Sequence, residues 1–364
     1  TSSLYWITIS LTFDQTFKIL IPIAFLVIPV FLAIFYGFAT YLIFYFKKFS
    51  NISLILIFSL TFSIFEYLRG NILSGFPWNL ISFSFSEFLP LLQLLSLIGT
   101  YSFNLFCLTL FVLPSLFYLK KNKHEIYFLV LFGLLLVSGV LFGQLNLVKS
   151  KNTTFKDNNF LIKIISPKIG IERFYYTENE EEIIENLIKL SKPNKEVKTI
   201  FVWPEGVFNN TELKNLKKYQ NIFKEKFSNK HLIIFGINNT VNDKTFNSMA
   251  VVNNNLDLIE FYNKNNLVPF GEFLPLEKLL KNIGMKTITN FYNSYSAGEK
   301  RDTIGLQNYE FDITFLPLIC YEIIYSGKLS KNNNYDLIIN ISEDGWFGKS
   351  IGPYQHFSHS IFRS

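Results

Sequence analysis

The chain has 364 residues, of which 49% are hydrophobic and 18% aromatic, and its mean hydropathy is +0.25. It is too apolar for an ordinary soluble domain and long enough for two domains. Its two cysteines, Cys107 and Cys320, give neither a disulfide framework nor the spacing of a zinc site. The formal net charge is +6, but lysine and asparagine are spread along the chain without a dense basic stripe, so we expect no nucleic-acid partner.

Four apolar runs within residues 1–148 predict a helical membrane domain, which we call the membrane half. The runs cover residues 18–46, 52–68, about 94–119 and 126–145. Runs of this kind are typical of helices that cross a bilayer. The alternative, four helices buried in a large soluble core, fits less well because all four fall in one half of the chain.

Lysines between the runs predict the orientation of the spans. Lys47 and Lys48 follow the first run, and three lysines within residues 120–123 follow the third. Both loops are short, so the positive-inside rule assigns them to the cytoplasm. The fourth run then leads outward, and we expect everything after about residue 149 to lie outside the cytoplasmic membrane.

Residues 155–364, the α/β half, alternate short β-rich runs with amphipathic helices, which is typical of an α/β domain. Residues 177–191 (TENEEEIIENLIKLS) predict a helix with a threonine cap and early acids, and residues 210–227 predict another helix. Strands are expected at residues 159–167, 197–206, 231–238, 246–252, 314–320 and 335–342.

Three polar residues stand at or near strand ends, where α/β enzymes place catalytic groups. Glu205 ends the run IFVWPE, Lys264 lies in FYNKNNLVPFGEFLP, and Cys320 closes TFLPLIC. A carboxylate can remove the proton of a thiol, and a lysine can stabilise a thiolate and a developing oxyanion. Taken singly, these residues are more often a solvated turn residue, a surface lysine and a core thiol. Their order and surroundings suggest a nucleophilic site.

The order Glu, Lys, Cys, each after an apolar strand, resembles the carbon–nitrogen hydrolase (nitrilase) superfamily. The strings WPEG, NKNNLVPFGEFLP, ICYE and NISEDGWFGKSIGPYQHF resemble its apolipoprotein N-acyltransferase family, and so does SGFPWNL in the membrane half. The resemblance implies a multi-pass α-helical membrane domain over residues 1–148, followed by an exported nitrilase-like αββα sandwich over residues 155–364. It also implies a chain shortened at both ends, without its opening spans and a closing span.

Carried over residue by residue, the resemblance implies a catalytic triad and a two-step (ping-pong) reaction. Glu205 would be the general base toward Cys320, and Lys264 would stabilise the tetrahedral oxyanion. Cys320 would attack an ester of a membrane phospholipid, leaving a thioester and a lysophospholipid. The α-amine of the diacylglyceryl-cysteine of an apolipoprotein would then take the acyl chain as an amide. This chemistry needs no cofactor and no metal.

The resemblance also implies supporting residues. Glu272 would orient Lys264 or relay protons, and Tyr321 and Glu322 would flank the nucleophile, with the Tyr321 N–H in the oxyanion site. Further candidates for lipid contact, each equally compatible with a packed or interfacial aromatic, are Trp78, Trp346 and Phe347. Where the family commonly has a tryptophan after the first strand, this chain has Phe174, Tyr175 and Tyr176.

Two other features are weaker signals. Glu66 and Arg69 share a helix face near the outer end of a span, either as an interfacial pair or as a polar seat near a lipid headgroup. His356 and His359 lack a third ligand at a recognisable spacing, so no metal site is expected.

These observations predict an enzyme of the bacterial cytoplasmic (inner) membrane, with its catalytic domain on the periplasmic side. Its expected partners are a phospholipid acyl donor, a diacylglyceryl apolipoprotein acceptor and the membrane. Two alternatives remain open. One is a membrane-tethered amidase or nitrilase in which water accepts the acyl group, and the other is a transporter or receptor whose outer domain only binds a ligand.

Overall fold

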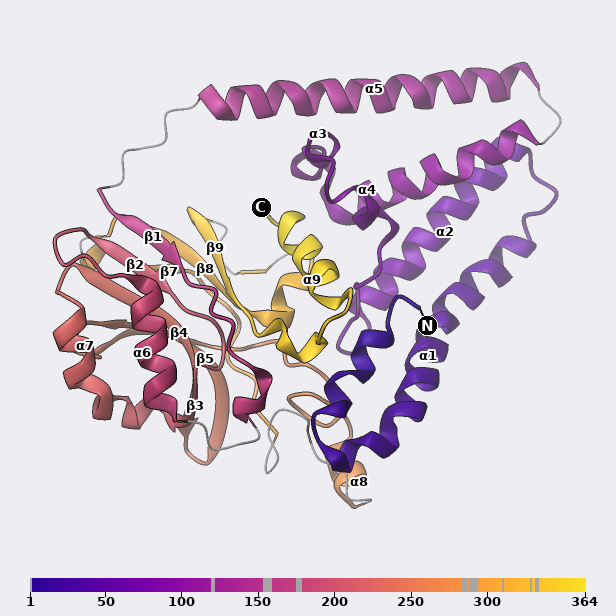
Figure 1. Ribbon diagram of the computed structural model, residues 1–364. Coiled ribbons are helices and arrows are strands. Elements are labelled where there is room, and N and C mark those ends of the chain that lie inside the picture. Colours follow the sequence, from indigo (N-terminus) through magenta and orange to yellow (C-terminus); the bar gives the residue numbers. More distant parts are fainter. Residues whose placement is uncertain are drawn as a thin grey trace.

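The computed structural model describes residues 2–118, 122–152, 159–174, 179–282, 287, 294–309, 311–327, 329–330 and 334–364. Long helices make up the membrane half, and two β-sheets with their covering helices make up the α/β half (Figure 1). Some residues named above lie outside the described residues, namely Lys120, Lys121, Tyr175, Tyr176 and the expected helix cap Thr177.

Among the described residues, four helical segments are long and apolar enough to cross a membrane, as predicted. Their main helices are α1 (Ile21–Phe44), α2 (Asn51–Asn71), α4 (Leu95–Val112) and α5 (Lys123–Asn152). Helix α1 packs along α2, and α2 packs along α4, whereas α5 packs against the short helix α3 (Leu89–Leu92) (Figure 1). A glycine at position 143 permits this last contact, because a Cβ there would lie 1.7 Å from the carbonyl oxygen of Pro90.

The larger sheet has the strand order β1-β2-β4-β5-β6, with β3 paired to β4. Strands β1, β2 and β4 run parallel, and β4, β5 and β6 are antiparallel neighbours. The smaller sheet has the order β7-β8-β9, and β8 and β9 run parallel. The strands are β1 (Leu161–Ile164), β2 (Thr199–Val202), β3 (Phe208–Glu212), β4 (His231–Val241), β5 (Lys244–Asn253), β6 (Leu258–Asn263), β7 (Ile304–Gly305), β8 (Thr314–Ile319) and β9 (Leu337–Ile341).

The two sheets pack face to face, as the expected sandwich requires. Helices α6 (Glu180–Ser191) and α7 (Gln220–Lys226) cover the outer face of the larger sheet, where Leu187 packs in one cluster with Phe201. The inner faces of both sheets form a second apolar cluster, which includes Phe315. Strands β2 and β8 and most of β4 are therefore buried on both faces, as is typical of strands enclosed between layers, whereas the edge strand β1 leaves Leu161 and Ile164 exposed.

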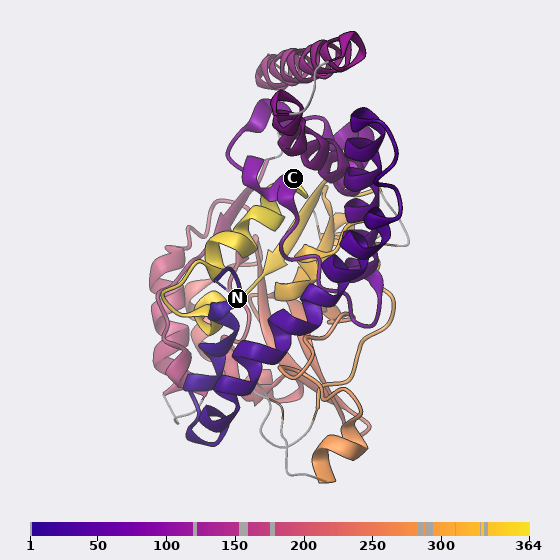
Figure 2. The ribbon, with the colours of Figure 1, turned by 90° about the vertical axis from the view of Figure 1, so that its right-hand side faces the viewer.

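The outer face of the smaller sheet is covered by α9 (Gly352–Ile361) and by parts of the membrane half. Helix α9 contacts η9 (Cys320–Ile324), the 3-10 turn that follows β8, and it lies between the sheets and the membrane helices (Figures 1 and 2). Leu318 of β8 shares an apolar cluster with Trp6 and Trp78 of the membrane half. The two halves of the chain therefore share one core beneath the strand that carries the candidate nucleophile.

The helix predicted over residues 210–227 is confirmed only in its last part. The segment begins in β3, continues as the 3-10 helix η7 (Leu213–Tyr219), and becomes α-helical only in α7. The buried carboxylate of Glu180 explains the difference. It accepts hydrogen bonds from the N–H of Asn210, at 2.9 Å, and from the hydroxyl of Thr211, which hold this stretch extended beside α6.

Other local predictions also need correction. Asn179, not a threonine, caps α6 by accepting a hydrogen bond from the Glu181 N–H.

Strands β6 and β7 and helix α9 were not predicted. β6 exposes most of its side chains, so it lacks a continuous apolar run, and β7 has only two residues. Helix α9 is short and begins with a proline in its first turn, and neither feature distinguishes it from a loop.

Candidate active site

The three candidate catalytic residues come from strand ends of both sheets. Glu205 lies three residues beyond the end of β2, Lys264 directly follows β6, and Cys320 directly follows β8. The Lys264 Nζ lies 3.7 Å from Glu205 Oε1, with the lysine side chain 1% and the glutamate side chain 12% exposed. The larger sheet thus contributes the carboxylate of Glu205 and the amine of Lys264, and the smaller sheet contributes the thiol of Cys320.

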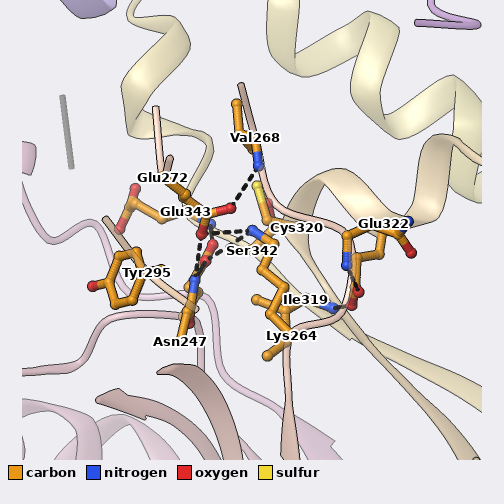
Figure 3. Close-up of polar contacts among 12 residues, drawn as sticks. Asn247, Lys264, Val268, Glu272, Tyr295, Ile319, Cys320, Glu322, Ser342 and Glu343 are labelled. Atoms are coloured by element: carbon orange, nitrogen blue, oxygen red, sulfur yellow. Dashed lines mark hydrogen bonds and ion pairs between the residues drawn. The ribbon is translucent and has the colours of Figure 1, made fainter. Parts of the chain in front are cut away.

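A second carboxylate, Glu272, completes a buried cluster around the lysine. Lys264 Nζ donates to Glu272 Oε1 at 3.0 Å, and the side-chain amide of Asn247 donates to Glu205 Oε1 at 2.7 Å and to Glu272 Oε1 at 2.8 Å. Figure 3 shows Asn247, Lys264 and Glu272 turned toward one another beside Cys320. The expected contact between Glu272 and Lys264 is present. Asn247 was not anticipated, because an asparagine inside a strand is only a weak signal in a single sequence.

Backbone donors fix the outer oxygens of both carboxylates. The Glu343 N–H donates to Glu205 Oε2 at 3.1 Å, and the Val268 N–H donates to Glu272 Oε2 at 2.9 Å. Arg173 in turn forms a buried ion pair with the Glu343 side chain. Each carboxylate is therefore held in one orientation, with its remaining oxygen directed to the lysine and the asparagine.

Burial and charge set the protonation of the three groups. Burial alone would favour the neutral amine of Lys264, but the carboxylates of Glu272 and Glu205 outweigh it and raise its pKa, so the lysine is an ammonium. Burial raises the pKa of Glu205, and Lys264 opposes that shift. Burial and then the charge of Glu205 raise the pKa of Cys320 well above its ordinary value, against the opposing effect of Lys264. The resting nucleophile is a neutral thiol that needs a base at hand.

The backbone at Cys320 adopts a conformation that non-glycine residues rarely take, with φ of 49°. The left-handed region costs such a residue about 1–2 kcal/mol. The Cys320 carbonyl oxygen faces His356 Nε2 at 3.2 Å and the Asn340 side-chain amide at 3.5 Å. The surroundings therefore stabilise a sharp turn that places the thiol at the end of its strand.

The two residues after the nucleophile point away from the thiol. The Tyr321 hydroxyl donates to the carbonyl oxygen of Gly75, in the membrane half, at 2.9 Å. Glu322 is fully buried, and its Oε2 accepts from the Ile319 N–H at 2.9 Å (Figure 3). Its Oε1 accepts from Tyr262 Oη at 2.7 Å, the N–H groups of Asn265 and Asn266 at 3.0 Å each, and Arg301 Nη2 at 2.7 Å. Glu322 therefore ties the nucleophile turn to the segment that follows Lys264.

The candidate lipid-contact aromatics have different surroundings. Trp78 is 2% exposed, and its Nε1 donates to Gln355 Oε1 at 2.8 Å, an oxygen that also accepts from Trp6. Phe347 packs edge-on against Trp6, with ring centroids 4.7 Å apart. Trp346 instead stacks on Phe174 at 5.4 Å. All three aromatics thus contribute to the packing between the two halves, because Trp346 also meets Phe13 of the membrane half edge-on, with ring centroids 6.1 Å apart. Phe174 is one of the three aromatics noted after the first expected strand.

Glu66 and Arg69 are both buried in the membrane half, at 3% exposure each. Glu66 accepts hydrogen bonds from the Tyr36 hydroxyl, at 3.3 Å, and from the Asn104 side chain. Arg69 Nη1 donates to the Phe76 carbonyl oxygen at 3.0 Å. The arginine therefore braces the loop that leads to Trp78, which fits a structural role.

In space, His356 is accompanied by two other candidate ligands, which the spacing of the sequence does not reveal. Ligand atoms of Cys320, Asp344 and His356 lie within 4.8 Å of one another. His359, in contrast, packs against Phe83, with ring centroids 4.3 Å apart. Both ring nitrogens of His356 already face hydrogen-bond partners, the Asp344 carboxylate and the Cys320 carbonyl, and these contacts account for the cluster without an ion.

Comparisons with known proteins cover nearly the whole chain. The model of the apolipoprotein N-acyltransferase N-terminal domain matches residues 1–113, and the carbon-nitrogen hydrolase model matches residues 207–363. Apolipoprotein N-acyltransferase of Rickettsia typhi (strain Wilmington) is 32% identical over 374 residues, which cover 100% of this chain and 72% of that protein. The enzyme of the same name from Rickettsia prowazekii (strain Madrid E) is 31% identical over 372 residues, with the same coverage.

A likeness among solved structures is more distant. The crystal structure of an amidase from Nesterenkonia sp. aligns with a TM-score of 0.35 and 8% identity, over 53% of this chain and 68% of that chain. This chain belongs to the apolipoprotein N-acyltransferase family.

Proposed function

We propose that this protein transfers a fatty acyl chain from a membrane phospholipid to the α-amine of the diacylglyceryl-cysteine at the N-terminus of apolipoproteins. The observation that carries the proposal is the convergence of Glu205, Lys264 and Cys320 at one buried site. Membership of the family supports the reaction class and its lipoprotein acceptor. Four membrane-spanning helices support a lipid donor, since they keep the site at a membrane surface.

In the first step, Glu205 takes the proton of the Cys320 thiol as the sulfur attacks the ester carbonyl of the phospholipid. Lys264 stabilises the negative charge that develops on the carbonyl oxygen. The tetrahedral intermediate then collapses, the C–O bond breaks, and the departing lysophospholipid alkoxide takes the proton from Glu205. The raised pKa of Glu205 suits a group that must both accept and return a proton.

In the second step, the α-amine of the acceptor attacks the thioester. Glu205 accepts the proton that the amine loses, the C–S bond breaks, and the leaving thiolate of Cys320 recovers that proton. An amide has formed, and the enzyme has returned to its resting state. Two acyl transfers of modest difficulty replace one direct exchange between an ester and an amine.

The position of the site supports lipid-anchored substrates. The segment after Cys320 is joined to the membrane half by the hydrogen bond from Tyr321 to Gly75, and Trp78 packs beside it. Lys47 and Lys48, just beyond the end of α1, support a cytoplasmic location for that loop. We therefore place the enzyme in the bacterial inner membrane with its active site on the periplasmic side.

Trapping the acyl-enzyme tests the proposal. After incubation with phospholipid alone, the intact protein is expected to gain the mass of one fatty acyl chain, located on Cys320 and removed by hydroxylamine. The variant Cys320→Ala should show no such gain, since Cys107 is buried in the membrane half. Acylation of that variant at an equal rate would contradict the proposal.

The acceptor separates transfer from hydrolysis. Addition of a diacylglyceryl-cysteine peptide with a free α-amine is expected to discharge the thioester and to yield the N-acyl peptide. The match to the carbon-nitrogen hydrolase model keeps one rival open, a hydrolase in which water is the acceptor. Rapid discharge to free fatty acid, unchanged by the peptide amine, would favour that rival over the proposed transfer.

A further inference from the structure

Asn247 is a polar residue at a position of β5 where the strand otherwise presents apolar side chains. Side chains two residues apart on a strand share a face, and Met249 and Val251 lie in the apolar cluster between the two sheets. Asn247 belongs to the same inner face and is 9% exposed. A buried amide is unfavourable unless it finds hydrogen-bond partners, so the partners of this side chain explain its presence.

The amide nitrogen of Asn247 donates to two carboxylates at once (Figure 3). It lies 2.7 Å from Glu205 Oε1 and 2.8 Å from Glu272 Oε1. An amide nitrogen carries two hydrogens, one for each of these oxygens. The backbone of the same residue holds the lysine, because its carbonyl oxygen accepts from the Lys264 N–H at 2.8 Å. Asn247 therefore contacts both carboxylates and the lysine.

Two carboxylates that share one donor are close enough to disfavour each other's charge. A proton taken up by Glu205 would disable the base, because only the ionised form can accept the thiol proton. Lys264 Nζ opposes this repulsion, at 3.7 Å from Glu205 and 3.0 Å from Glu272. In the proposed reaction the same ammonium also stabilises the oxyanion, so the substrate competes for it. The carboxylates thus need a second donor that the substrate does not engage.

The balance of effects on Glu205 shows what loss of that donor would do. The charged and titratable groups that face it come from several elements, and they are Lys264, Glu272, Glu343, Cys320 and Tyr295. Burial has the largest effect and raises the pKa of Glu205, and the carboxylates of Glu272 and Glu343 act in the same direction. Lys264 and the hydrogen bond from Asn247 oppose that rise. Without the amide, more of Glu205 would be protonated at a given pH.

We propose that Asn247 is a positioning residue that keeps Glu205 ionised and in one orientation. Its two N–H donors hold the neighbouring oxygens of Glu205 and Glu272, and the Glu343 N–H holds the other oxygen of Glu205 at 3.1 Å. The strand β5 fixes the amide, so these contacts remain when Lys264 turns to the oxyanion. This inference rests on the proposed acyl transfer through Cys320 and assigns a role to a residue outside the Glu–Lys–Cys triad.

The pH dependence of thioester formation tests the inference on the full chain in detergent micelles. Asn247→Leu keeps a branched side chain but removes both donors, and Asn247→Thr suits a strand and keeps one hydroxyl donor. In Asn247→Leu the acidic limb of the rate is expected to move up by about one pH unit, the lower end of the effect of a hydrogen bond to a charged group. At a fixed pH within the limb, acylation should slow by about tenfold. Asn247→Thr should show a smaller shift in the same direction.

Asn253→Leu is the matched control. Asn253 lies on the same strand, and its side-chain amide also donates to a carboxylate, that of Asp257, at 2.9 Å. It lies six residues further along β5, a distance of about 20 Å, so it is remote from Glu205. The limb should stay at its wild-type pH in this variant, whatever happens to the melting temperature. If Asn247→Leu and Asn247→Thr lower the melting temperature but leave the limb in place, Asn247 only packs the strand and the inference is wrong.

The wild-type chain separates this inference from the proposed function. If the wild type forms no thioester on Cys320, the acyl transfer itself is refuted, and the role of Asn247 falls with it. If the wild type forms the thioester and neither variant moves the limb, the acyl transfer stands and the inference alone is overturned. A shift of the limb in both variants, larger for leucine than for threonine, is the result that supports it.

Discussion

Replacement of Glu205 with glutamine is expected to slow thioester formation by about 10²- to 10⁴-fold, the usual contribution of a general base. The reason is the state of the nucleophile. Burial keeps Cys320 as a neutral thiol at rest, so the reaction needs a base that removes its proton during the attack. A carboxamide cannot do this. The measurement is the rate of hydroxylamine-sensitive acylation of Cys320 in a single turnover with excess phospholipid.

Glu272→Gln is the matched control for that variant. Glu272 is also buried, also contacts Lys264, and accepts from the same side-chain amide of Asn247. If Glu205 is the base, Glu272→Gln should slow acylation much less than Glu205→Gln does, because it disturbs the lysine without removing the base. The reverse order of the two rates would identify Glu272 as the base and contradict the assignment.

The pH dependence of acylation gives a second check on the same group. A general base acts in its deprotonated form, and burial raises the pKa of Glu205 above that of an ordinary glutamate. The wild-type rate should therefore fall as the pH drops through this raised pKa, at a higher pH than for an exposed carboxylate. The apparent value will belong to the coupled group of Glu205, Lys264 and Glu272 rather than to one residue. In Glu205→Gln, this acidic limb should disappear.

Local patterns were sufficient to predict the spans and most strands. Hydropathy identifies a membrane-spanning helix without knowledge of its neighbours, and the four predicted runs correspond to the four spanning segments. A strand such as β8 can likewise be recognised in the sequence as a short apolar run. Residues 210–227 show the limit of this approach. Their helical periodicity is overridden in the first residues by hydrogen bonds to Glu180, which lies about 30 residues earlier in the chain.

Some residues of the candidate site could likewise be predicted from the sequence, and others could not. Glu205, Lys264 and Cys320 could be named from strand ends and from motifs of the family, and the structure brings them together. Asn247 could not be named, because its two carboxylate partners lie 42 and 25 residues away. His356 was noticed only as a metal candidate. Its partners, Asp344 and the Cys320 carbonyl, become visible only when α9 is placed against the nucleophile turn.

Contacts between the two halves explain why a membrane domain is joined so closely to this site. The Gln355 side chain accepts from the indole N–H groups of Trp6 and Trp78, and it directly precedes His356 on α9. Arg363, two residues beyond the end of α9, donates to Thr100 of the membrane half and to the Tyr325 carbonyl. The helix that holds the nucleophile turn is therefore itself held by the membrane half, so the geometry of the site depends on both parts of the chain.

Replacement of Glu322 with alanine is expected to have the largest effect on stability. Its fully buried carboxylate is the shared acceptor for Arg301, Tyr262 and three backbone N–H groups. Burial disfavours the charge on Arg301, and Glu322 outweighs that effect and raises the pKa of the arginine. Removal of one partner of such a buried pair leaves an uncompensated charge, at a cost of about 3–5 kcal/mol.

The measurement is thermal unfolding of the full chain in detergent, where this loss should lower the midpoint by about 5–10 °C. Glu196→Ala is the control, since Glu196 pairs with Lys230 at 3.1 Å but both side chains are largely exposed, at 85% and 41%. Such an exposed pair is worth about 0–1 kcal/mol, so its loss should barely move the midpoint. Equal midpoints for the two variants would show that Glu322 does not hold the nucleophile turn.

Below its lowered midpoint, Glu322→Ala should also form the thioester more slowly than the wild type. The carboxylate binds the N–H groups of Asn265 and Asn266, directly after Lys264, and the N–H of Ile319, directly before Cys320. It is therefore the link that fixes the distance between the lysine and the thiol. If folded Glu322→Ala acylated Cys320 at the wild-type rate, the two residues would keep their geometry without this link, and Glu322 would contribute to stability alone.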